Sequence, residues 1–311
     1  MSKICLKKFR EKHSEYSNIT ENWLIWFIGF FEGDGCFTIG KKNIEIVISQ
    51  NELNKSILLE MKDKFGFGQV LAQKKFNVPG KLWVYRYIVR DFKGQNVLLT
   101  LFHNNLVIPL KKHKYNNFIK IYNEKLLRAK ERRMDKFSHL VLLNQAVIEP
   151  LPTSKDSWLC GFTDAEGCFY TSVISNGKIR ACFDLAQKEN ENHSCKNVFS
   201  VIKKDIIKAG YLSFKKSKNT NSVYISVRSS SIKKGLSQIH KYFNRFTLKT
   251  SKIYDFLLQK ETLLRFNESN HLSDREQLIN LIKHSKKNSS NRKKGHGFSV
   301  KNEEQLADVE N

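Results

Sequence analysis

A short motif that occurs twice is the feature that most constrains the fold of this chain. Residues 27–37 read FIGFFEGDGCF and residues 159–169 read LCGFTDAEGCF, so the same kinds of residue recur in the same order. Asp34 in the first copy and Glu166 in the second stand at the same place, and a glycine follows each. Self-similarity of this kind predicts two units of similar fold within one chain. At 311 residues the chain is long enough for each unit to bury a core.

The stretches that follow the two motifs repeat the same order of expected elements. A hairpin comes first, with second strands that end at Gln50 and Gln187, and then a helical pattern, a second hairpin and a further helix. The expected fold class is α+β, with two pseudo-symmetric αββαββα units whose antiparallel β-sheets form a saddle. The first unit is expected over residues 18–124 and the second over residues 157–265.

Three segments lie outside the two units. Residues 1–17 are expected to form an N-terminal extension, and residues 125–156 a linker, charged at first and then interrupted by Pro150 and Pro152. Residues 266–311 are polar and basic, and we expect this C-terminal tail to be disordered because it has few apolar residues to bury.

The charge of the chain indicates a polyanionic partner. Lys and Arg number 54 against 30 Asp and Glu, for a net charge of +24. So large an excess repels itself in the compact state unless a polyanion neutralises it. Nucleic acid is the first candidate, and an anionic membrane surface, which has only the net charge in its favour, is the second. The longest apolar run, residues 23–31, is about half of the roughly 20 residues that a membrane span needs, so no membrane association is expected.

The two motifs are expected to lie on helices that pack against each other. Thr20 and Ser157 are expected N-caps of these helices. Each motif has two small residues four positions apart, Gly29 and Gly33 in the first copy and Gly161 and Ala165 at the matching positions of the second. Small residues at this spacing would let two helix backbones approach closely.

Packing of the motif helices would bring two carboxylates together. Asp34 and Glu166 would each lie at a helix C-terminus, where the helix dipole disfavours negative charge. At a separation of about 5 Å, two carboxylates repel by roughly 3 kcal/mol in a medium of intermediate dielectric constant. A divalent cation between them would remove that repulsion, and carboxylate oxygens together with water and phosphate suit Mg²⁺.

With these residues in view, the two motifs resemble those of the LAGLIDADG homing-endonuclease family in its single-chain, two-repeat form. The resemblance covers about residues 18–265 and implies a DNA-binding saddle with catalytic Mg²⁺ (or Mn²⁺). It implies that Asp34 and Glu166 bind the metal, at sites that also include Gly33 and Ala165, and that Glu32 and Asp164 support the motif. It also implies catalytic roles near the scissile phosphates for Gln50, Gln187, Lys111 and Lys249.

Alternation along the strands separates a core face from a second, outward face. In residues 178–187, for example, Ala181, Phe183 and Leu185 are expected to face the core. Outward side chains could read base edges in the major groove, and lysines at turns could contact phosphates. The residues expected to bind DNA are Lys41, Lys42, Asn43, Ser49, Lys74, Lys75, Arg86, Arg90, Tyr170, Lys178, Arg180, Asp184, Lys215, Tyr224, Ser226 and Arg228.

The function that the resemblance implies is site-specific cleavage of double-stranded DNA by a monomer. The target would be long and asymmetric, cleavage would leave short 3′ overhangs, and the result would promote intron mobility. An excess of Lys over Arg together with abundant Asn and Ile suits an A/T-rich organelle genome, with the mitochondrion favoured over the chloroplast. Two alternatives remain open: an RNA maturase that assists splicing of its own group I intron RNA, and a DNA-recognition protein that binds without cutting.

Overall fold

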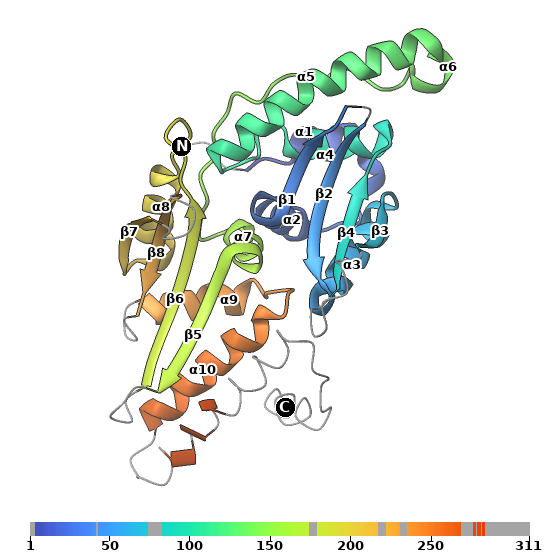
Figure 1. Ribbon diagram of the computed structural model, residues 1–311. Coiled ribbons are helices and arrows are strands. Elements are labelled where there is room, and N and C mark those ends of the chain that lie inside the picture. The colour runs from blue at the N-terminus through green and yellow to red at the C-terminus, as the bar shows by residue number, and fades with distance from the viewer. Residues whose placement is uncertain are drawn as a thin grey trace.

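The chain folds into two α+β halves, each built on a four-stranded antiparallel sheet (Figure 1). The computed structural model describes residues 4–41, 43–73, 83–173, 179–216, 222–230 and 235–268, and three residue pairs at 276–277, 279–280 and 282–283. Within these ranges, no helix is both long enough and apolar enough to cross a membrane.

The first half places its sheet in the strand order β1-β2-β4-β3. Its elements are α1 (Lys7–Lys12), the 3-10 turn η1 (Ser14–Tyr16), α2 (Glu21–Asp34), β1 (Gly35–Ile39), β2 (Ile44–Asn51), the 3-10 turn η2 (Glu52–Asn54), α3 (Lys55–Phe65), β3 (Gln69–Gln73), β4 (Val84–Val89), α4 (Phe92–Phe102), α5 (Pro109–Arg132) and α6 (Met134–Phe137).

The second half repeats this arrangement, with the strand order β5-β6-β8-β7. Its elements are α7 (Trp158–Glu166), β5 (Gly167–Val173), β6 (Ile179–Lys188), α8 (Lys196–Val201), the π-helical turn η3 (Ile202–Ile207), β7 (Tyr211–Lys216), β8 (Val223–Ser229), α9 (Ser237–Arg245) and α10 (Lys252–Glu268). The predicted fold class and the repeated order of elements are therefore confirmed, with one further helix, α5 or α10, closing each repeat.

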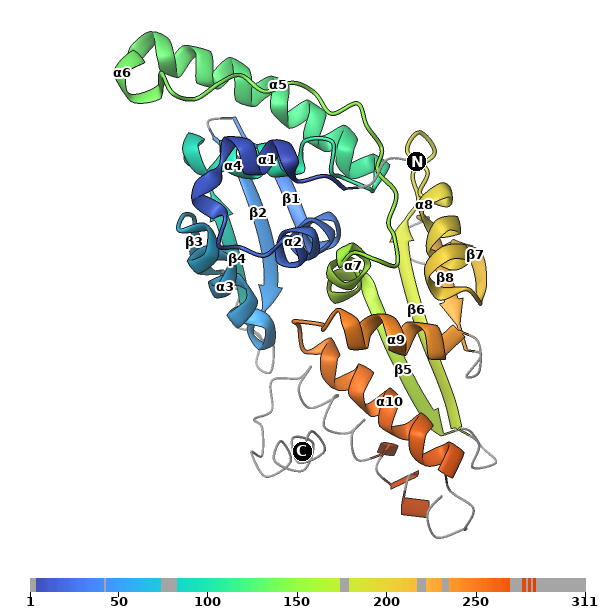
Figure 2. The ribbon, with the colours of Figure 1, turned by 180° about the vertical axis from the view of Figure 1, so that it is seen from behind.

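Each sheet buries one face under helices and leaves the other face free of them. Viewed from behind, α9 and α10 cross the back of β5 and β6, and α1 and α4 cover the first sheet (Figure 2). On β2 the residues Ile44, Ile46 and Ile48 are buried in the core. The neighbour of Ile48 on the sheet is the buried Tyr87, whereas Ser49 lies opposite Arg86 on the outward face. The predicted alternation of the strands is therefore confirmed.

The two halves meet where α2 packs against α7. A Cβ atom added to Gly29 would lie 2.1 Å from the carbonyl oxygen of Trp158, and one added to Gly161 would lie 1.8 Å from that of Trp26. Real Cβ atoms do not come so close to backbone, so only glycine fits at either position. The predicted close packing of the motif helices is thus confirmed at these two glycines.

Two tryptophan side chains cross the helix pair in opposite directions. The indole Nε1 of Trp158, on α7, donates to Glu32 of α2 at 2.6 Å, and that of Trp26, on α2, donates to Asp164 of α7 at 2.8 Å. The same two carboxylates accept backbone N–H groups at the start of each closing helix, Glu32 from Ile108 and Asp164 from Thr250. Each acidic residue therefore ties the helix pair to the end of its own repeat.

Of the two expected N-caps, the structure confirms Thr20 and corrects Ser157. The hydroxyl of Thr20 accepts the backbone N–H of Trp23. The hydroxyl of Ser157 instead donates to the carbonyl of Asn22 at the start of α2, and Asp156 accepts the N–H of Trp158. Ser157 thus joins the two motif helices, and its neighbour caps α7.

The boundary expected at residue 124 lies inside α5, which continues to Arg132. Beyond α6 the linker runs back along α5 without regular structure. The side-chain amide of Asn123 exchanges two hydrogen bonds with the backbone of Leu143, and that of Asn116 does the same with Ala146. The linker is therefore fastened to α5. Most of the tail from residue 266, which we expected to be disordered, lies outside the described residues.

Replacement of Gly161 by alanine tests the helix contact. We expect Gly161→Ala to lower the free energy of unfolding by about 3 kcal/mol or more, because the new methyl group has to push two helix backbones apart. Chemical denaturation measures the change. Ser56→Ala, at an exposed position of α3, is the control. Equal stability of the two variants would contradict the packing described above.

The buried carboxyl of Glu32 predicts a pH-dependent stability. Burial raises the pKa of Glu32 from 4.5 to about 7, against the hydrogen bonds from Ile108 and Trp158, which lower it. A raised folded-state pKa adds stability that is fully present below pH 4.5 and is lost as the pH rises towards 7. The change is on the order of 3 kcal/mol.

Denaturation of the wild type and of Glu32→Gln at pH 5 and pH 8 checks this expectation. The wild type should lose stability relative to Glu32→Gln over this interval, because only the wild type acquires a buried charge. A constant difference between the two proteins at both pH values would show that Glu32 does not titrate in this range.

Candidate metal and nucleic-acid site

Asp34 and Glu166 are the last residues of α2 and α7 and come together where the two helices end. A Cβ atom added to Gly33 would lie 2.2 Å from the Cβ of Ala165 and 3.0 Å from the Cγ of Glu166. The helix ends are thus in contact, and each is followed at once by the first strand of its sheet. The sequence predicted this meeting of one carboxylate from each repeat.

The environment of these two carboxylates favours a bound cation. Burial raises the pKa of Asp34 and of Glu166, and the charge of Asp34 raises that of Glu166 further. Lys252 and Lys111 oppose the shift in both cases, but burial remains the largest cause. Positive charge supplied between the carboxylates would therefore stabilise their ionised forms.

The donor set fits a hard divalent metal that keeps part of its own coordination shell. The described residues contain no group of three or more His, Cys, Asp or Glu side chains that could hold a metal. Two carboxylates with nearby backbone carbonyls leave room for water and phosphate oxygens, which is the coordination that Mg²⁺ favours. The residues present thus fit Mg²⁺ or Mn²⁺ better than a metal that needs a complete protein cage.

Beside Asp34 the protein surface is hollowed into a pocket of about 340 Å³. Gln50, near the end of β2, donates from its side-chain Nε2 to Asp34 at 2.5 Å, and is itself hydrogen-bonded by Asn54. The pocket is lined by Asp34, Ser49, Gln50, Asn51, Asn54, Val84, Asp164, Ala165 and Lys252. The predicted Gln50 is therefore in direct contact with its carboxylate.

Gln187 occupies the corresponding place in the second sheet. Gly35 pairs with Ile48 in the first sheet, as Gly167 pairs with Leu185 in the second, so Gln50 and Gln187 each lie two residues further along. The side-chain oxygen of Gln187 is buried and has no hydrogen-bond partner among the described residues. The two halves of the site are thus alike in backbone and different in hydrogen bonding.

Lysines from both closing helices lie beside the carboxylates, but one of them is not the lysine that the sequence predicted. The ammonium group of Lys111 donates to the carbonyl of Gly35 at 2.6 Å, and that of Lys252 donates to the carbonyl of Ala165 at 2.7 Å. Lys249 instead lies 3.5 Å from Glu60. Lys252 is therefore the structural counterpart of Lys111, and the catalytic role expected of Lys249 stays a prediction.

The structure and the sequence pattern align the starts of the two closing helices differently. The carboxylate of Glu32 accepts the backbone N–H of Ile108, and in the second repeat Asp164 accepts that of Lys249. Asp164 also accepts the N–H of Thr250. Lys111 lies three residues after Ile108, and Lys252 lies three residues after Lys249 and two after Thr250, so Lys252 takes the place of Lys111. Both tracts read Leu-Lys-x-x-Lys, and this pattern matches only when Lys111 is set against Lys249, so the sequence favours a register that the structure does not use.

The outward faces of the sheets carry many of the residues expected to bind DNA, and several of these are paired with other side chains. Arg90 forms an ion pair with Glu45 at 2.6 Å, Arg228 forms one with Asp184, and the hydroxyls of Ser213 and Ser226 are hydrogen-bonded. These faces also carry Ser49, Arg86, Tyr170, Arg180, Lys215 and Tyr224, and Lys41 and Asn43 lie exposed at the β1–β2 turn. Lys42, Lys74, Lys75 and Lys178 lie outside the described residues.

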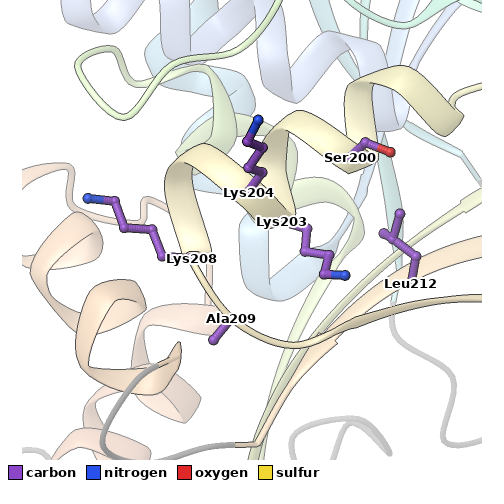
Figure 3. Close-up of a pocket in the computed structure, with 6 residues that line it drawn as sticks. All are labelled: Ser200, Lys203, Lys204, Lys208, Ala209 and Leu212. Carbon is purple, nitrogen blue, oxygen red and sulfur yellow. The ribbon is translucent and has the colours of Figure 1, made fainter.

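A second hollow, of about 420 Å³, lies far from the carboxylates at the edge of the second sheet (Figure 3). It lies between η3 and β7, and its lining comprises Ser200, Lys203, Lys204, Lys208, Ala209 and Leu212. The three lysines project in different directions in Figure 3 and do not converge on one point. This hollow contains no acidic side chain, so it does not compete with the carboxylate pair as the metal site.

Two residues of the site were missed from the sequence. Lys252 carried the right chemical signal but was aligned with Lys114. Asn54, at the start of α3, gave no signal of its own, because an asparagine before a helix is an ordinary N-cap residue. Its contacts with Gln50 and with the second repeat exist only in the folded chain.

Comparison with known proteins agrees with this architecture. The family model described as LAGLIDADG endonuclease matches residues 27–122 and 159–263, one match in each repeat. Among solved structures, the LAGLIDADG homing endonuclease I-GzeII in complex with its DNA target superposes with a TM-score of 0.62 at 18% identity, covering 83% of this chain and 96% of that one. The meganuclease I-SmaMI bound to DNA gives a TM-score of 0.64 at 16% identity, covering 85% and 99%.

Similar curated proteins are named as intron-encoded endonucleases. The "Probable intron-encoded endonuclease 4" of Neurospora crassa is 31% identical over 257 residues, covering 79% of this chain and 41% of that protein. The "Intron-encoded DNA endonuclease aI3" of Saccharomyces cerevisiae is 25% identical over 284 residues, covering 78% of this chain and 63% of that protein. The chain therefore spans less than half of the Neurospora protein and less than two thirds of the Saccharomyces one. With a family match in each repeat and the two-fold arrangement of helices and sheets, this chain belongs to the LAGLIDADG endonuclease family.

Proposed function

We propose that the chain is a site-specific homing endonuclease that cleaves both strands of double-stranded DNA with the help of a divalent metal. The observation that carries this proposal is the pair Asp34 and Glu166, one from each repeat, half-buried at the centre of two open sheet faces. A net charge of +24 suits binding to a nucleic-acid backbone. Family membership and the names of the similar proteins support the same activity.

Asp34 and Glu166 would hold Mg²⁺ or Mn²⁺, with the backbone at Gly33 and Ala165 contributing to the site. A bound metal of this kind supplies a hydroxide nucleophile at neutral pH and stabilises charge on the phosphate. Gln50 orients the Asp34 carboxylate through its hydrogen bond. The carbonyl of Ala165 already accepts Lys252 and keeps a second lone pair for another partner. I-SmaMI has been solved with uncleaved DNA in the presence of calcium ions, which supports a divalent-metal site in the fold.

Lys111 and Lys252 would act as electrostatic partners of the scissile phosphates. Burial lowers the pKa of both ammonium groups, that of Lys111 to about 8, while the neighbouring carboxylates, Glu32 above all for Lys111, raise it. Lys111 therefore retains its proton at neutral pH. A preorganised ammonium group stabilises charge that develops on the phosphate oxygens.

The outward faces of the sheets would enter the major groove and read base edges. Their residues differ between the repeats: Ser49 lies opposite Arg86 on the first sheet, whereas at the matching place on the second sheet Ala186 lies opposite Ser226. Two unlike half-surfaces imply a long target without two-fold symmetry. We also propose that the protein acts as a monomer, that its cleavage leaves short 3′ overhangs, and that this cleavage promotes intron mobility. Relatives named after cox1 introns, together with the A/T-rich residue bias, support the mitochondrion as its location.

The first test is cleavage of DNA that spans the intronless insertion site of the host gene. With Mg²⁺ the wild type should make a double-strand break, and EDTA should abolish it. Asp34→Asn and Glu166→Gln should each reduce cleavage by about 100-fold or more. Each substitution removes one of the two charged ligands that hold the metal beside the phosphate. Asp63→Asn, at an exposed position of α3, is the control. Tight binding without cutting by the wild type would refute the nuclease, and group I intron RNA would be tested next.

The second test compares the contributions of Lys111 and Lys252 to cleavage with that of Lys249. Lys111→Met and Lys252→Met should each slow single-turnover cleavage by about 100-fold. Lys249→Met should change the rate by about fivefold or less, since the ammonium group of Lys249 lies beside Glu60 in a partly exposed ion pair and over the Trp26 ring, away from Asp34 and Glu166. A larger loss in Lys249→Met than in Lys252→Met would restore the assignment made from the sequence.

A further inference from the structure

We infer that Asn54 is a positioning residue for Asp34, and that it couples this carboxylate, and not Glu166, to the backbone of the opposite repeat. Asn54 acts through Gln50 and contacts neither carboxylate itself. The consequence for cleavage rests on the proposed nuclease function, whereas the hydrogen-bond geometry does not.

Three hydrogen bonds lead in one direction from the second repeat to Asp34, and the first of them crosses the repeat interface. The backbone N–H of Ser251, just before α10, donates to the side-chain oxygen of Asn54 at 2.9 Å. The side-chain nitrogen of Asn54 donates to the oxygen of Gln50 at 3.1 Å. The side-chain nitrogen of Gln50 then donates to Asp34 at 2.5 Å. We call this series the Asn54 relay.

The direction of the Asn54 relay is fixed at its origin. A backbone N–H can only donate, so the side-chain oxygen of Asn54 must face Ser251 and its NH₂ group must face Gln50. By the same argument, the oxygen of Gln50 is occupied and its NH₂ group must face Asp34. An asparagine sets this order because its side chain both accepts and donates. The relay therefore presents a hydrogen-bond donor to one oxygen of Asp34.

Local structure does not account for the use of Asn54 in this way. Asn54 occupies the N-cap position of α3, where its oxygen would ordinarily accept an N–H of the first helical turn, yet it makes no capping hydrogen bond. Both Asn54 and Gln50 are 9% exposed, so water does not readily replace their partners. The helix forgoes its cap, and the side chain instead joins the two repeats.

Further contacts hold α3 and the start of α10 together beside the relay. Glu60 of α3 accepts the indole N–H of Trp23 at 2.6 Å and lies 3.5 Å from the ammonium group of Lys249. Ser251 is thus kept close to Asn54 by more than the relay itself.

Among the residues that the structure describes, the second half of the site has no equivalent of the relay. The side-chain oxygen of Gln187, which corresponds to Gln50, is buried without a hydrogen-bond partner in the described part of the chain. Glu189, shortly after Gln187, accepts the backbone N–H of Cys195 within its own repeat. Asp34 and Glu166 are therefore held differently, and the two DNA strands should differ in their dependence on Asn54.

Replacement of Asn54 by aspartate reverses the relay while keeping its first hydrogen bond. An aspartate still accepts the N–H of Ser251, so the contact between the repeats survives. It cannot donate to Gln50, whose NH₂ group then turns towards residue 54 and whose oxygen turns towards Asp34. Two oxygens would face each other at the metal site. Asn54→Ala removes the relay without adding charge and is the second variant.

The experiment measures cleavage of each DNA strand separately with Mg²⁺, using end-labelled duplex under single-turnover conditions. We expect Asn54→Asp to slow one strand by roughly tenfold or more relative to the other, so that nicked DNA accumulates, with little change in DNA affinity. Asn54→Ala should slow the same strand. Asn190→Asp is the matched control, because Asn190 follows β6 in the second repeat and its oxygen accepts a turn N–H that aspartate also accepts.

A second readout needs neither metal nor DNA. In ¹⁵N-labelled metal-free protein, the side-chain amide signals of Gln50 should move in Asn54→Asp and stay in place in Asn190→Asp. Equal slowing of both strands, or no slowing, together with unmoved Gln50 signals in a folded Asn54→Asp protein would overturn the inference. If the wild type cuts no DNA, the proposed function fails, and the Gln50 signals still decide whether the relay exists.

Discussion

The contact between α2 and α7 is the constraint on which the other parts of the structure depend. Gly29 and Gly161 let each helix lie against the backbone of the other, where a single methyl group would not fit. This closeness has two results. It brings the C-terminal ends of both helices to one point, and it directs the strands that follow into two separate sheets. The position of the carboxylates and the open sheet faces therefore have the same steric origin.

Electrostatic balance at the centre comes from the closing helices. Each motif helix carries two acidic residues in its last turn, and the structure gives the two different partners. Glu32 and Asp164 are satisfied by tryptophan and backbone N–H groups and need no cation. The negative charges of Asp34 and Glu166 are offset mainly by the positive charges of Lys111 and Lys252, so both carboxylates are suited to a metal. The same residue types thus divide into a structural pair and a chemical pair by their hydrogen bonds.

The near-symmetry of the fold ends at the hydrogen bonds around the carboxylates. Gln50 and Gln187 have the same place in their sheets, but Gln50 is joined to the opposite repeat through Asn54, whereas the side-chain oxygen of Gln187 has no partner among the described residues. A protein that meets a DNA target without two-fold symmetry has no need of identical half-sites. Differences of this kind can persist because the glycine contact and the crossed tryptophans preserve the backbone arrangement in spite of them.

The sequence by itself determined the two-repeat α+β fold, the pairing of Asp34 with Glu166 and the outward faces of the strands. These depend on local patterns: a motif that occurs twice, helical spacing of small residues and alternation along strands. Tertiary structure alone decided that Lys252, rather than Lys249, accompanies Lys111, because the Leu-Lys-x-x-Lys pattern matches Lys111 with Lys249, whereas the folded chain places the ammonium groups of Lys111 and Lys252 at the ends of the motif helices. It also decided the role of Asn54, since the partner that orients its side chain is a backbone N–H nearly 200 residues away along the chain, which no local pattern reports.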